Sequence, residues 1–405
     1  MEVYNRLLSE ADKIEVIDTH EHLNPQKDYL GDEPDILCDY LSHYISSDLM
    51  AAGMPEAELQ KARDPKPGIA ERFGMLSPYL DRVRNGSYFR ALQIAAERLY
   101  GVSDITRETI EGMDERFKKA VRAGDYAKYI MKDVCGIKVS LNDGWIDDIK
   151  AAKTDMFEPV WNFGHYFNPG FKPESPDLGT YCEAFAEKLK KQRDDGLRIF
   201  KVPFAYSRPI YFEDVDYKTA DGAYRETLKD GGQFKKQTQD YIMHFALRFA
   251  EENGFAVQIH TGLQEGMRHN LEDSNPLLLK NLFAKYPGVA FDLFHTGYPY
   301  DREIIVLAKY HPNVYIDMCW AHIISPYASR KFLNEALDVV PYAKIFGFGG
   351  DYLFYDAIYG HLTLAKRDIC EVLADKANRK DISVDLAERI LRALLHDNAA
   401  RVFNV

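Results

Sequence analysis

Short apolar segments alternate with helical stretches along this chain, and that alternation most constrains how it can fold. Eight runs rich in Val, Ile and Phe read as strands, and from the fourth onward their gaps carry helix-spaced apolar residues. Strands joined by helices form parallel sheets. Eight such units predict an α/β fold, a (β/α)8 TIM barrel, which needs ~250 residues. The predicted strands lie at about residues 14–18, 134–141, 156–161, 197–203, 255–260, 289–295, 314–317 and 344–351.

The residues beyond those that the barrel needs lie mainly between the first two predicted strands. The chain has 405 residues, and the first two predicted strands are separated by a long stretch with helical spacing of apolar residues. We therefore expect a single domain over 1–405 with a helical insertion at 23–133, after strand one, that caps the barrel mouth. Helices are predicted at 36–52, 56–63, 68–85, 88–100, 106–123 and 126–132 in the insertion, and at 233–253, 276–286, 300–310, 329–339 and 384–397 beyond it.

Composition excludes some classes of partner. The chain has 51 Lys and Arg against 63 Asp and Glu, a net charge of −12, so it lacks the basic surplus that nucleic acids or anionic membranes attract. No apolar run approaches the ~20 residues of a membrane span, and residues 1–5 resemble no signal peptide. The five scattered cysteines indicate free thiols in a reducing cytoplasm. We expect a cytoplasmic protein with a small-molecule partner; a homo-oligomer is compatible with the sequence.

A His-x-His motif ends the first predicted strand. Residues i and i+2 of a strand point to the same face, so His20 and His22 can reach one ion together. Neutral imidazole is the commonest protein ligand of catalytic transition metals. The pair therefore indicates a metal site at the end of strand one.

Other strand ends supply matching groups. Lys201 lies on the fourth strand, His260 and His295 end the fifth and sixth, and Asp351 ends the eighth. Each alone has an ordinary explanation, such as a packed histidine or a turn aspartate. Because the carboxyl ends of barrel strands meet at one mouth, their joint occurrence predicts a catalytic metal site with an open coordination position.

This order of residues resembles the amidohydrolase superfamily of (β/α)8 metal enzymes. The resemblance spans about residues 14–403 and is most specific in Ile259–Gly262, Asn275–Leu279, Phe294–Pro299 and Tyr310–Asp317. These segments are similar to the amidohydrolase-2 branch, in particular to the domain found fused to glutamine-synthetase-like proteins. The 18–25 segment and the long insertion also resemble uronate isomerases. The 351–356 segment, however, lacks their longer Asp/Ser/Arg-rich signature after strand eight.

The resemblance implies a ligand set and a mechanism. His20, His22, Asp351 and His260 would hold one divalent ion, Zn²⁺ or another such as Mn²⁺, which activates a water molecule. Asp351 would also shuttle the proton, and His295 would polarise the substrate or orient the water. In binuclear relatives a carboxylated lysine bridges two ions; here that would be Lys201, with His260 and His295 on the second ion. One metal is favoured, since this branch is often mononuclear, but two stay open.

Several residues just past the strand ends could contact substrate. Arg208 follows the fourth strand, and a guanidinium suits a carboxylate. Lys201, if not carboxylated, could do the same. The aromatic candidates are Tyr206, Tyr298, Trp320 and Tyr352.

The expected function is metal-dependent hydrolysis of a small, carboxylated molecule, at a non-peptide amide or at a lactone or ester. A uronate-isomerase-like reaction or a metal-dependent decarboxylation runs on similar ligands, so both remain alternatives. A non-catalytic binding module is disfavoured, because its ligand set would have been free to change.

Overall fold

The predicted barrel is confirmed. The computed structural model describes residues 1–24, 33–144, 147–172 and 174–405. Its strands are all parallel and pair in the orders β1-β2-β3 and β4-β5-β6-β7-β8-β9. They are β1 (Val16–Glu21), β2 (Ile137–Asn142), β3 (Phe157–Pro159), β4 (Trp161–Asn162), β5 (Ile199–Val202), β6 (Ala256–Ile259), β7 (Ala290–Leu293), β8 (Val314–Asp317) and β9 (Ile345–Phe346).

Backbone hydrogen bonds join the two sheets into a ring. Val160 alone separates β3 from β4, and its N–H donates to Asn142 O at 3.0 Å, so the two short strands occupy one barrel position. At the other seam, Thr19 N donates to Phe348 O at 3.1 Å and Asp351 N donates to His20 O at 2.8 Å. The segment after β9 therefore lies against β1, which places Asp351 beside His20.

The floor of the barrel is apolar. Ile17, Leu141, Ile199 and Phe346 belong to one buried cluster contributed by strands around the ring. The C-terminal helix α19 (Asn398–Phe403) adds Ala399 and Phe403 to that cluster. This packing closes the end of the barrel opposite the mouth, so polar chemistry is confined to the carboxyl ends of the strands.

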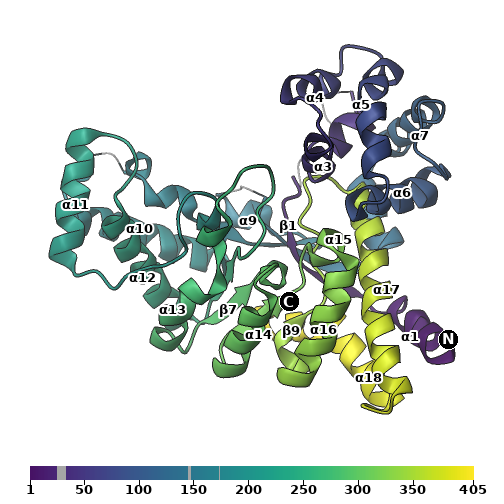
Figure 1. The fold of residues 1–405 in the computed structure, drawn as a ribbon. Coiled ribbons are helices and arrows are strands. Elements are labelled where there is room, and N and C mark those ends of the chain that lie inside the picture. Colours follow the sequence, from purple (N-terminus) through teal and green to yellow (C-terminus); the bar gives the residue numbers. More distant parts are fainter. Residues whose placement is uncertain (25–32, 145–146, 173) are drawn as a thin grey trace.

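A group of helices stands between β1 and β2, as the sequence indicated, and rises above the mouth (Figure 1). Residues 25–32 of the predicted 23–133 insertion lie outside the described residues, so its exact bounds stay a prediction. The helices are α2 (Ile36–Tyr40), α3 (Ile45–Ala51), α4 (Glu56–Arg63), α5 (Ile69–Val83), α6 (Ser87–Tyr100), α7 (Ile110–Arg122) and α8 (Tyr126–Lys128), followed by a π-helical segment, Tyr129–Val134.

The insertion is packed tightly on the barrel. Helix α6 lies across α17 (Asp356–Asn378), and a Cβ atom on Gly360 would come within 1.9 Å of Ala91 O. Only glycine permits this backbone approach. The other helices are α1 (Glu2–Ala11), α9 (Ile149–Ala152), α10 (Leu178–Asp194), α11 (Tyr217–Asp230), α12 (Lys236–Asn253), α13 (Lys280–Lys285), α14 (Asp301–Tyr310), α15 (Ala321–Ile324), α16 (Pro326–Val339) and α18 (Val384–Arg392).

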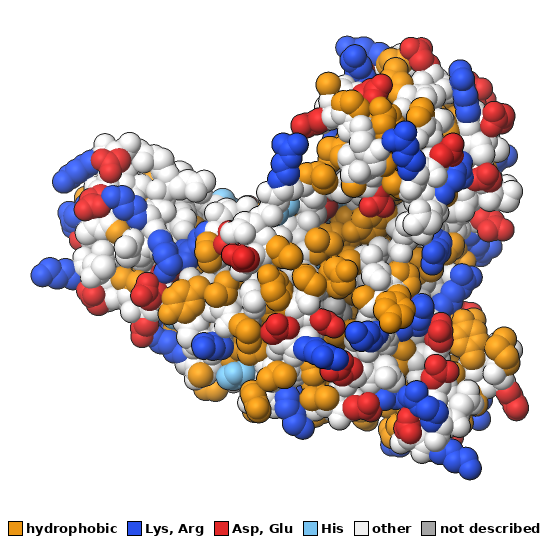
Figure 2. All heavy atoms as spheres, viewed as in Figure 1, with side chains coloured by type: hydrophobic (Ala, Val, Ile, Leu, Met, Phe, Trp, Pro, Cys, Tyr) orange, Lys and Arg blue, Asp and Glu red, His pale blue; other side chains and the backbone are white. Residues whose placement is uncertain are grey.

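Two helical lobes flank the mouth. The α3–α7 group stands on one side and the α10–α12 group on the other (Figure 1). Figure 2 shows a hollow between them, with histidine side chains at its base. Across the described part of the chain, no helix has the length and apolar character needed to span a membrane.

Candidate metal centre

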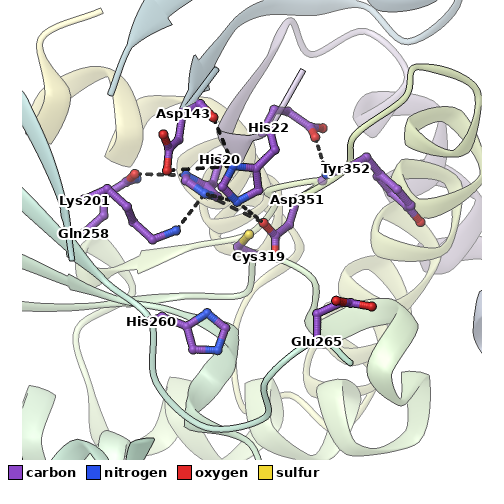
Figure 3. Close-up of polar contacts among 12 residues, drawn as sticks. His20, His22, Asp143, Lys201, Gln258, His260, Glu265, Cys319, Asp351 and Tyr352 are labelled. Carbon is purple, nitrogen blue, oxygen red and sulfur yellow. Dashed lines mark hydrogen bonds and ion pairs between the residues drawn. The ribbon is translucent and has the colours of Figure 1, made fainter. Parts of the chain in front are cut away.

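His20 and His22 converge at the end of β1, as the strand spacing predicts. Their Nε2 atoms lie 3.3 Å apart, and both rings point into the mouth (Figure 3). His22 Nδ1 lies 3.0 Å from the backbone carbonyl oxygen of Asp143. A carbonyl can only accept, so Nδ1 of the neutral ring carries the proton and Nε2 turns its lone pair toward His20 and Asp351.

Asp351 completes this group from the opposite seam. Its Oδ1 lies 3.3 Å from His22 Nε2 and 3.7 Å from His20 Nε2. The residue has a left-handed backbone, with a φ of 63°, and follows Gly350, where a Cβ would lie 1.8 Å from Glu21 Oε1. Burial alone would raise the pKa of Asp351, but the facing histidines and Lys201 hold it well below its ordinary value.

Lys201 lies deep in the same site. Its Nζ is 2.9 Å from His20 Nε2 and 4.6 Å from the centre of the Phe294 ring. Burial, followed by the charge of Lys201, holds the pKa of His20 well below its ordinary value. His20 is therefore neutral at physiological pH, as a metal ligand must be.

His260 and His295 form a second pair rather than joining the first group. His295 Nε2 lies 3.1 Å from His260 Nδ1, and it lies 3.8 Å from Asp351 Oδ2. Burial lowers the pKa of His295 to about 4. The ligand atoms of His20, His22 and Asp351 lie within 4.8 Å of one another, and His260 is outside that set, so its place as fourth ligand stays a prediction.

Arg208, predicted to bind a substrate carboxylate, is bonded to α12, and its substrate role stays a prediction. Its guanidinium donates to Asp240 Oδ1 at 2.6 Å and to Gln239 Oε1 at 2.9 Å, both on α12. Asp240 is fully buried and needs this cation. These bonds engage both terminal nitrogens of the guanidinium, so Arg208 fixes the loop after β5 to α12.

The predicted aromatic residues have different positions. The ring of Tyr206 lies 4.7 Å from that of His260, and Trp320 lies 5.0 Å from His295. Tyr352 lies 5.4 Å from Tyr44. Tyr298 contributes its backbone carbonyl to Leu263 N at 2.7 Å, so for this residue ring contact with a substrate stays a prediction.

The insertion contributes residues that the sequence did not single out. Tyr44 stacks on Trp320 at 4.6 Å and donates to the backbone oxygen of Asp351 at 2.5 Å. Tyr88 lies 5.1 Å from Tyr44 in a second stack. Ser47, on α3, donates to Glu265 Oε1 at 3.3 Å, so the loop after β6 also contacts the insertion. Sequence spacing cannot reveal such pairs, because they join distant segments.

Gln258 and Cys319 were also missed, although strand periodicity offered a signal. Gln258 lies on β6 two residues before His260, and its Oε1 is 3.1 Å from His20 Nδ1. Cys319 follows β8 and presents its backbone oxygen to His295 Nδ1 at 2.9 Å. Residues at i and i+2 share a face, so both could have been placed near the site.

Buried carboxyl groups lie behind the histidines. Burial raises the pKa of Asp18 to about 6 and of Asp317 to about 7, and it also raises those of Glu21 and Asp292. Asp18 accepts from Ser140 Oγ at 2.7 Å, and Asp292 accepts from Gln258 at 3.0 Å. These groups hold the strands and the histidines in fixed positions.

The donor set fits a divalent metal ion. His22 Nε2 is free of a proton and faces the second Nε2 at 3.3 Å, while the Asp351 carboxylate lies against both. Imidazole nitrogens with a carboxylate and room for a further ligand are typical of catalytic zinc and related metals. A cation between these atoms would satisfy all of them.

Comparison with known proteins agrees with this geometry. A sequence model described as Amidohydrolase matches residues 215–405, which include His260, His295 and Asp351. Over these residues the chain is similar to the amidohydrolase family. Protein fluG of Emericella nidulans is 33% identical over 151 residues, which is 37% of this chain but only 17% of that protein.

Longer but weaker likenesses extend over the whole chain. Uronate isomerase of Corynebacterium efficiens is 20% identical over 452 aligned positions, covering 100% of this chain and 96% of that protein. The solved uronate isomerase of Thermotoga maritima has a TM-score of 0.81 at 15% identity, over 99% of this chain and 97% of that one. At this identity the structural likeness establishes the fold alone.

Proposed function

We propose that this protein is a metal-dependent hydrolase of a small, carboxylated substrate, with Zn²⁺ as its metal. The observation that carries the proposal is the group of His20 Nε2, His22 Nε2 and Asp351 Oδ1, all within 3.7 Å of one another. His20, His22 and Asp351 would hold the ion. When bound, such an ion supplies Lewis acidity and a bound water of lowered pKa.

The side chains around that group have separate roles. Asp351 stays ionised because its pKa is held low. Its Oδ2, which faces His295, would take a proton from the attacking water and return it to the leaving group. His295, with Nδ1 bonded to the Cys319 carbonyl, presents an unprotonated Nε2 that would orient the attacking water. Lys201, buried beside His20, is the cation closest to the reacting centre.

The site also suggests how substrate is held. With Arg208 engaged by Asp240, Lys201 replaces it as the partner proposed for a substrate carboxylate or carbonyl oxygen. The stacked rings of Tyr44 and Trp320 form a wall beside His295 and exclude water from that side. A small planar or ring-shaped acid would fit against such a wall.

Isomerisation of a uronic acid is the second candidate. It is supported by the similarity in fold to the uronate isomerase of Thermotoga maritima over 99% of this chain. An isomerase moves protons between substrate carbons and oxygens without consuming water. The two functions are therefore separated by whether a substrate is cleaved or rearranged.

The test begins with purified protein reloaded with Zn²⁺. Lactones, esters and non-peptide amides of small acids are assayed for hydrolysis, and glucuronate is assayed for conversion to a keto sugar. Asp351→Asn should lower turnover by about 10²–10⁴-fold, because it removes the proton acceptor. His20→Ala should lose metal with little loss of folding, since the barrel keeps its own core.

Matched variants make the result specific. His396→Ala changes a half-buried histidine that bonds the Glu15 carbonyl, and Asp133→Asn changes an exposed aspartate. Both should retain metal and turnover. Full turnover in Asp351→Asn would remove Asp351 as the proton shuttle, and glucuronate conversion without any hydrolysis would replace the hydrolase with the isomerase.

A further inference from the structure

A cavity lies at the end of the barrel opposite the candidate metal centre. Its volume is about 570 Å³, within the range of small-molecule sites. Gly136, in its lining, directly precedes β2, and its carbonyl oxygen accepts from the N–H of Val16, the first residue of β1, at 2.9 Å. The cavity therefore borders the amino ends of these strands, whereas His20, His22 and Asp351 lie at the carboxyl ends.

Three helices and a π-helical segment form the walls of this cavity. Helix α17 packs against both α1 and α6 (Figure 1), and all three contribute to the lining. The segment Tyr129–Val134 adds a further wall, and at its end the N–H of Cys135 donates to Ile130 O at 2.9 Å. Such π-helical turns are rare and frequently mark functional sites. The cavity thus has a backbone irregularity that regular helix packing does not require.

Lys366, on α17, is the cation in the lining that most needs a partner. Its side chain is only 11% exposed, and its Nζ lies 3.4 Å from Asp12 Oδ1. The Asp12 side chain is 69% exposed, so water competes for its carboxylate and the ion pair contributes little. A lysine buried to this degree is normally held by a closer anion. An anionic ligand in the cavity would supply one.

Two arginines bring further positive charge to the same cavity. Arg98 lies on α6, and Arg367 follows Lys366 on α17. Both are exposed, and neither guanidinium forms a hydrogen bond or an ion pair with the residues that the structure describes. Three cations against the carboxylates of Asp12 and Asp133 leave the lining net positive, in a chain whose net charge is −12. A local charge opposite to that of the whole chain attracts anions to this cavity.

The rest of the lining indicates the remainder of the ligand. Leu8 and Leu362 supply apolar surface for a carbon skeleton. Asp12 can accept hydrogen bonds from hydroxyl groups, and the Tyr359 hydroxyl can donate to them or accept from them. Asp133 is exposed and can turn to solvent. A ligand with one anionic group and several hydroxyl groups therefore matches the lining.

We propose that this cavity binds a small hydroxylated phosphate ester, that is, a sugar or polyol phosphate. Three cationic side chains exceed what one carboxylate needs, whereas a phosphate dianion presents three acceptor oxygens to Lys366, Arg98 and Arg367. Movement of the exposed Asp12 carboxylate away from Lys366 frees that cation for the phosphate and leaves Asp12 to accept from the ligand hydroxyls. The site is separate from the candidate metal centre and does not depend on the proposed function.

The test is isothermal titration calorimetry of the full chain as purified, with a thermal shift assay beside it. Glycerol phosphate should bind, inorganic phosphate should bind more weakly, and glycerol should not bind. Lys366→Met and Arg98→Gln should each raise the Kd for glycerol phosphate by about 10–100-fold, because each removes a charge-assisted hydrogen bond. Arg98 is exposed, so its variant should fold even if Lys366→Met is unstable. Arg389→Gln, which changes an exposed arginine on α18, should bind as the parent does.

His20→Ala separates this site from the candidate metal centre. That variant should bind glycerol phosphate with the affinity of the parent, whatever the outcome for hydrolysis. Binding that is lost in His20→Ala or Lys201→Met, but kept in Lys366→Met and Arg98→Gln, would place the phosphate at the barrel mouth and overturn the proposal. Neither heat nor a rise in Tm with millimolar glycerol phosphate would overturn it as well. Equal affinity for inorganic phosphate and glycerol phosphate would overturn the role of the ligand hydroxyls.

Discussion

At the scale of single residues, the orientation of His20 depends on one amide. Gln258 Nε2 donates to Thr19 O at 2.8 Å and to Asp292 Oδ2 at 3.0 Å. Because the Thr19 carbonyl can only accept, the amide nitrogen must be on that side, and Oε1 must face His20 Nδ1. His20 then carries its proton on Nδ1, and the lone pair that would bind a metal is that of Nε2, beside Lys201 Nζ.

Replacing Gln258 by Leu should therefore weaken the site without removing a ligand. The loss of this support should raise the Kd for Zn²⁺ by about 10–100-fold, which a chelator competition titration measures. Gln192→Leu is the matched control, since Gln192 is also buried but bonds Asp147 away from the mouth. Equal zinc affinity in Gln258→Leu and the parent would show that the amide does not position His20.

The carboxyl pair behind the histidines predicts a pH dependence of stability. Burial raises the pKa of Asp317 to about 7 and also raises that of Asp292. Between the ordinary aspartate pKa of ~3.9 and about 7, the folded state holds a proton that the unfolded chain has released. The contribution of Asp317 to stability is therefore present at low pH and is lost as pH rises through that window.

Asp317→Asn should remove this loss. Between pH 5 and pH 8, the free energy of unfolding of the metal-free parent should fall relative to that of the variant. Urea unfolding at each pH measures this difference. Histidines titrate in the same window with the opposite sign, but they are common to both proteins. Asp133→Asn, at an exposed carboxylate, should follow the parent. Parallel curves for Asp317→Asn and the parent would contradict the assignment.

At the scale of elements, strands with continuous apolar sequences could be predicted, whereas a helix with polar residues on its buried face could not. The eight strand positions match the apolar runs, because barrel strands are buried on both faces and read as continuous hydrophobic segments. Helix α17 was not anticipated. Its buried face includes Asp356, His361 and Asp368, so polar residues interrupt the apolar stripe that identifies a surface helix.

In the candidate site too, some residues could be placed from the sequence and others could not. His20, His22 and Asp351 could be placed from the sequence because each ends a strand, and the barrel brings strand ends together. Whether His260 joins that group depends on the orientation of its ring, whose Nε2 bonds Leu263 O at 2.8 Å. The engagement of Arg208 by Asp240 depends on the path of a loop, which residue spacing does not specify.

Arg208 offers a test at this scale, because it joins the loop after β5 to α12. Arg208→Ala leaves the buried Asp240 with Lys236 as its cationic partner among the described ion pairs. The free energy of unfolding should fall by about 3 kcal/mol, as measured by urea unfolding. KM for any substrate found should change little. A tenfold or larger rise in KM with unchanged stability would restore Arg208 as a substrate ligand.

At the scale of the whole molecule, the active site depends on contact between the insertion and the barrel. Tyr100, at the end of α6, and Tyr126, in α8, both donate to the buried carboxylate of Asp356. Asp356 begins α17, five residues after Asp351. A single buried carboxylate thus connects two insertion helices to the segment that carries Asp351, a proposed metal ligand.

Loosening this connection should disturb the site from a distance. Tyr126→Phe removes one hydrogen bond to a buried charged group, which is worth about 1.5–3 kcal/mol. Amide hydrogen exchange, followed by mass spectrometry, should accelerate in α6, α7 and the 351–356 segment, while exchange in β5–β8 stays unchanged. Tyr129→Phe is the matched control, since Tyr129 is 42% exposed. Unchanged exchange in Tyr126→Phe would mean that stacking of Tyr44 on Trp320 and the close packing at Gly360 suffice to hold the insertion on the barrel.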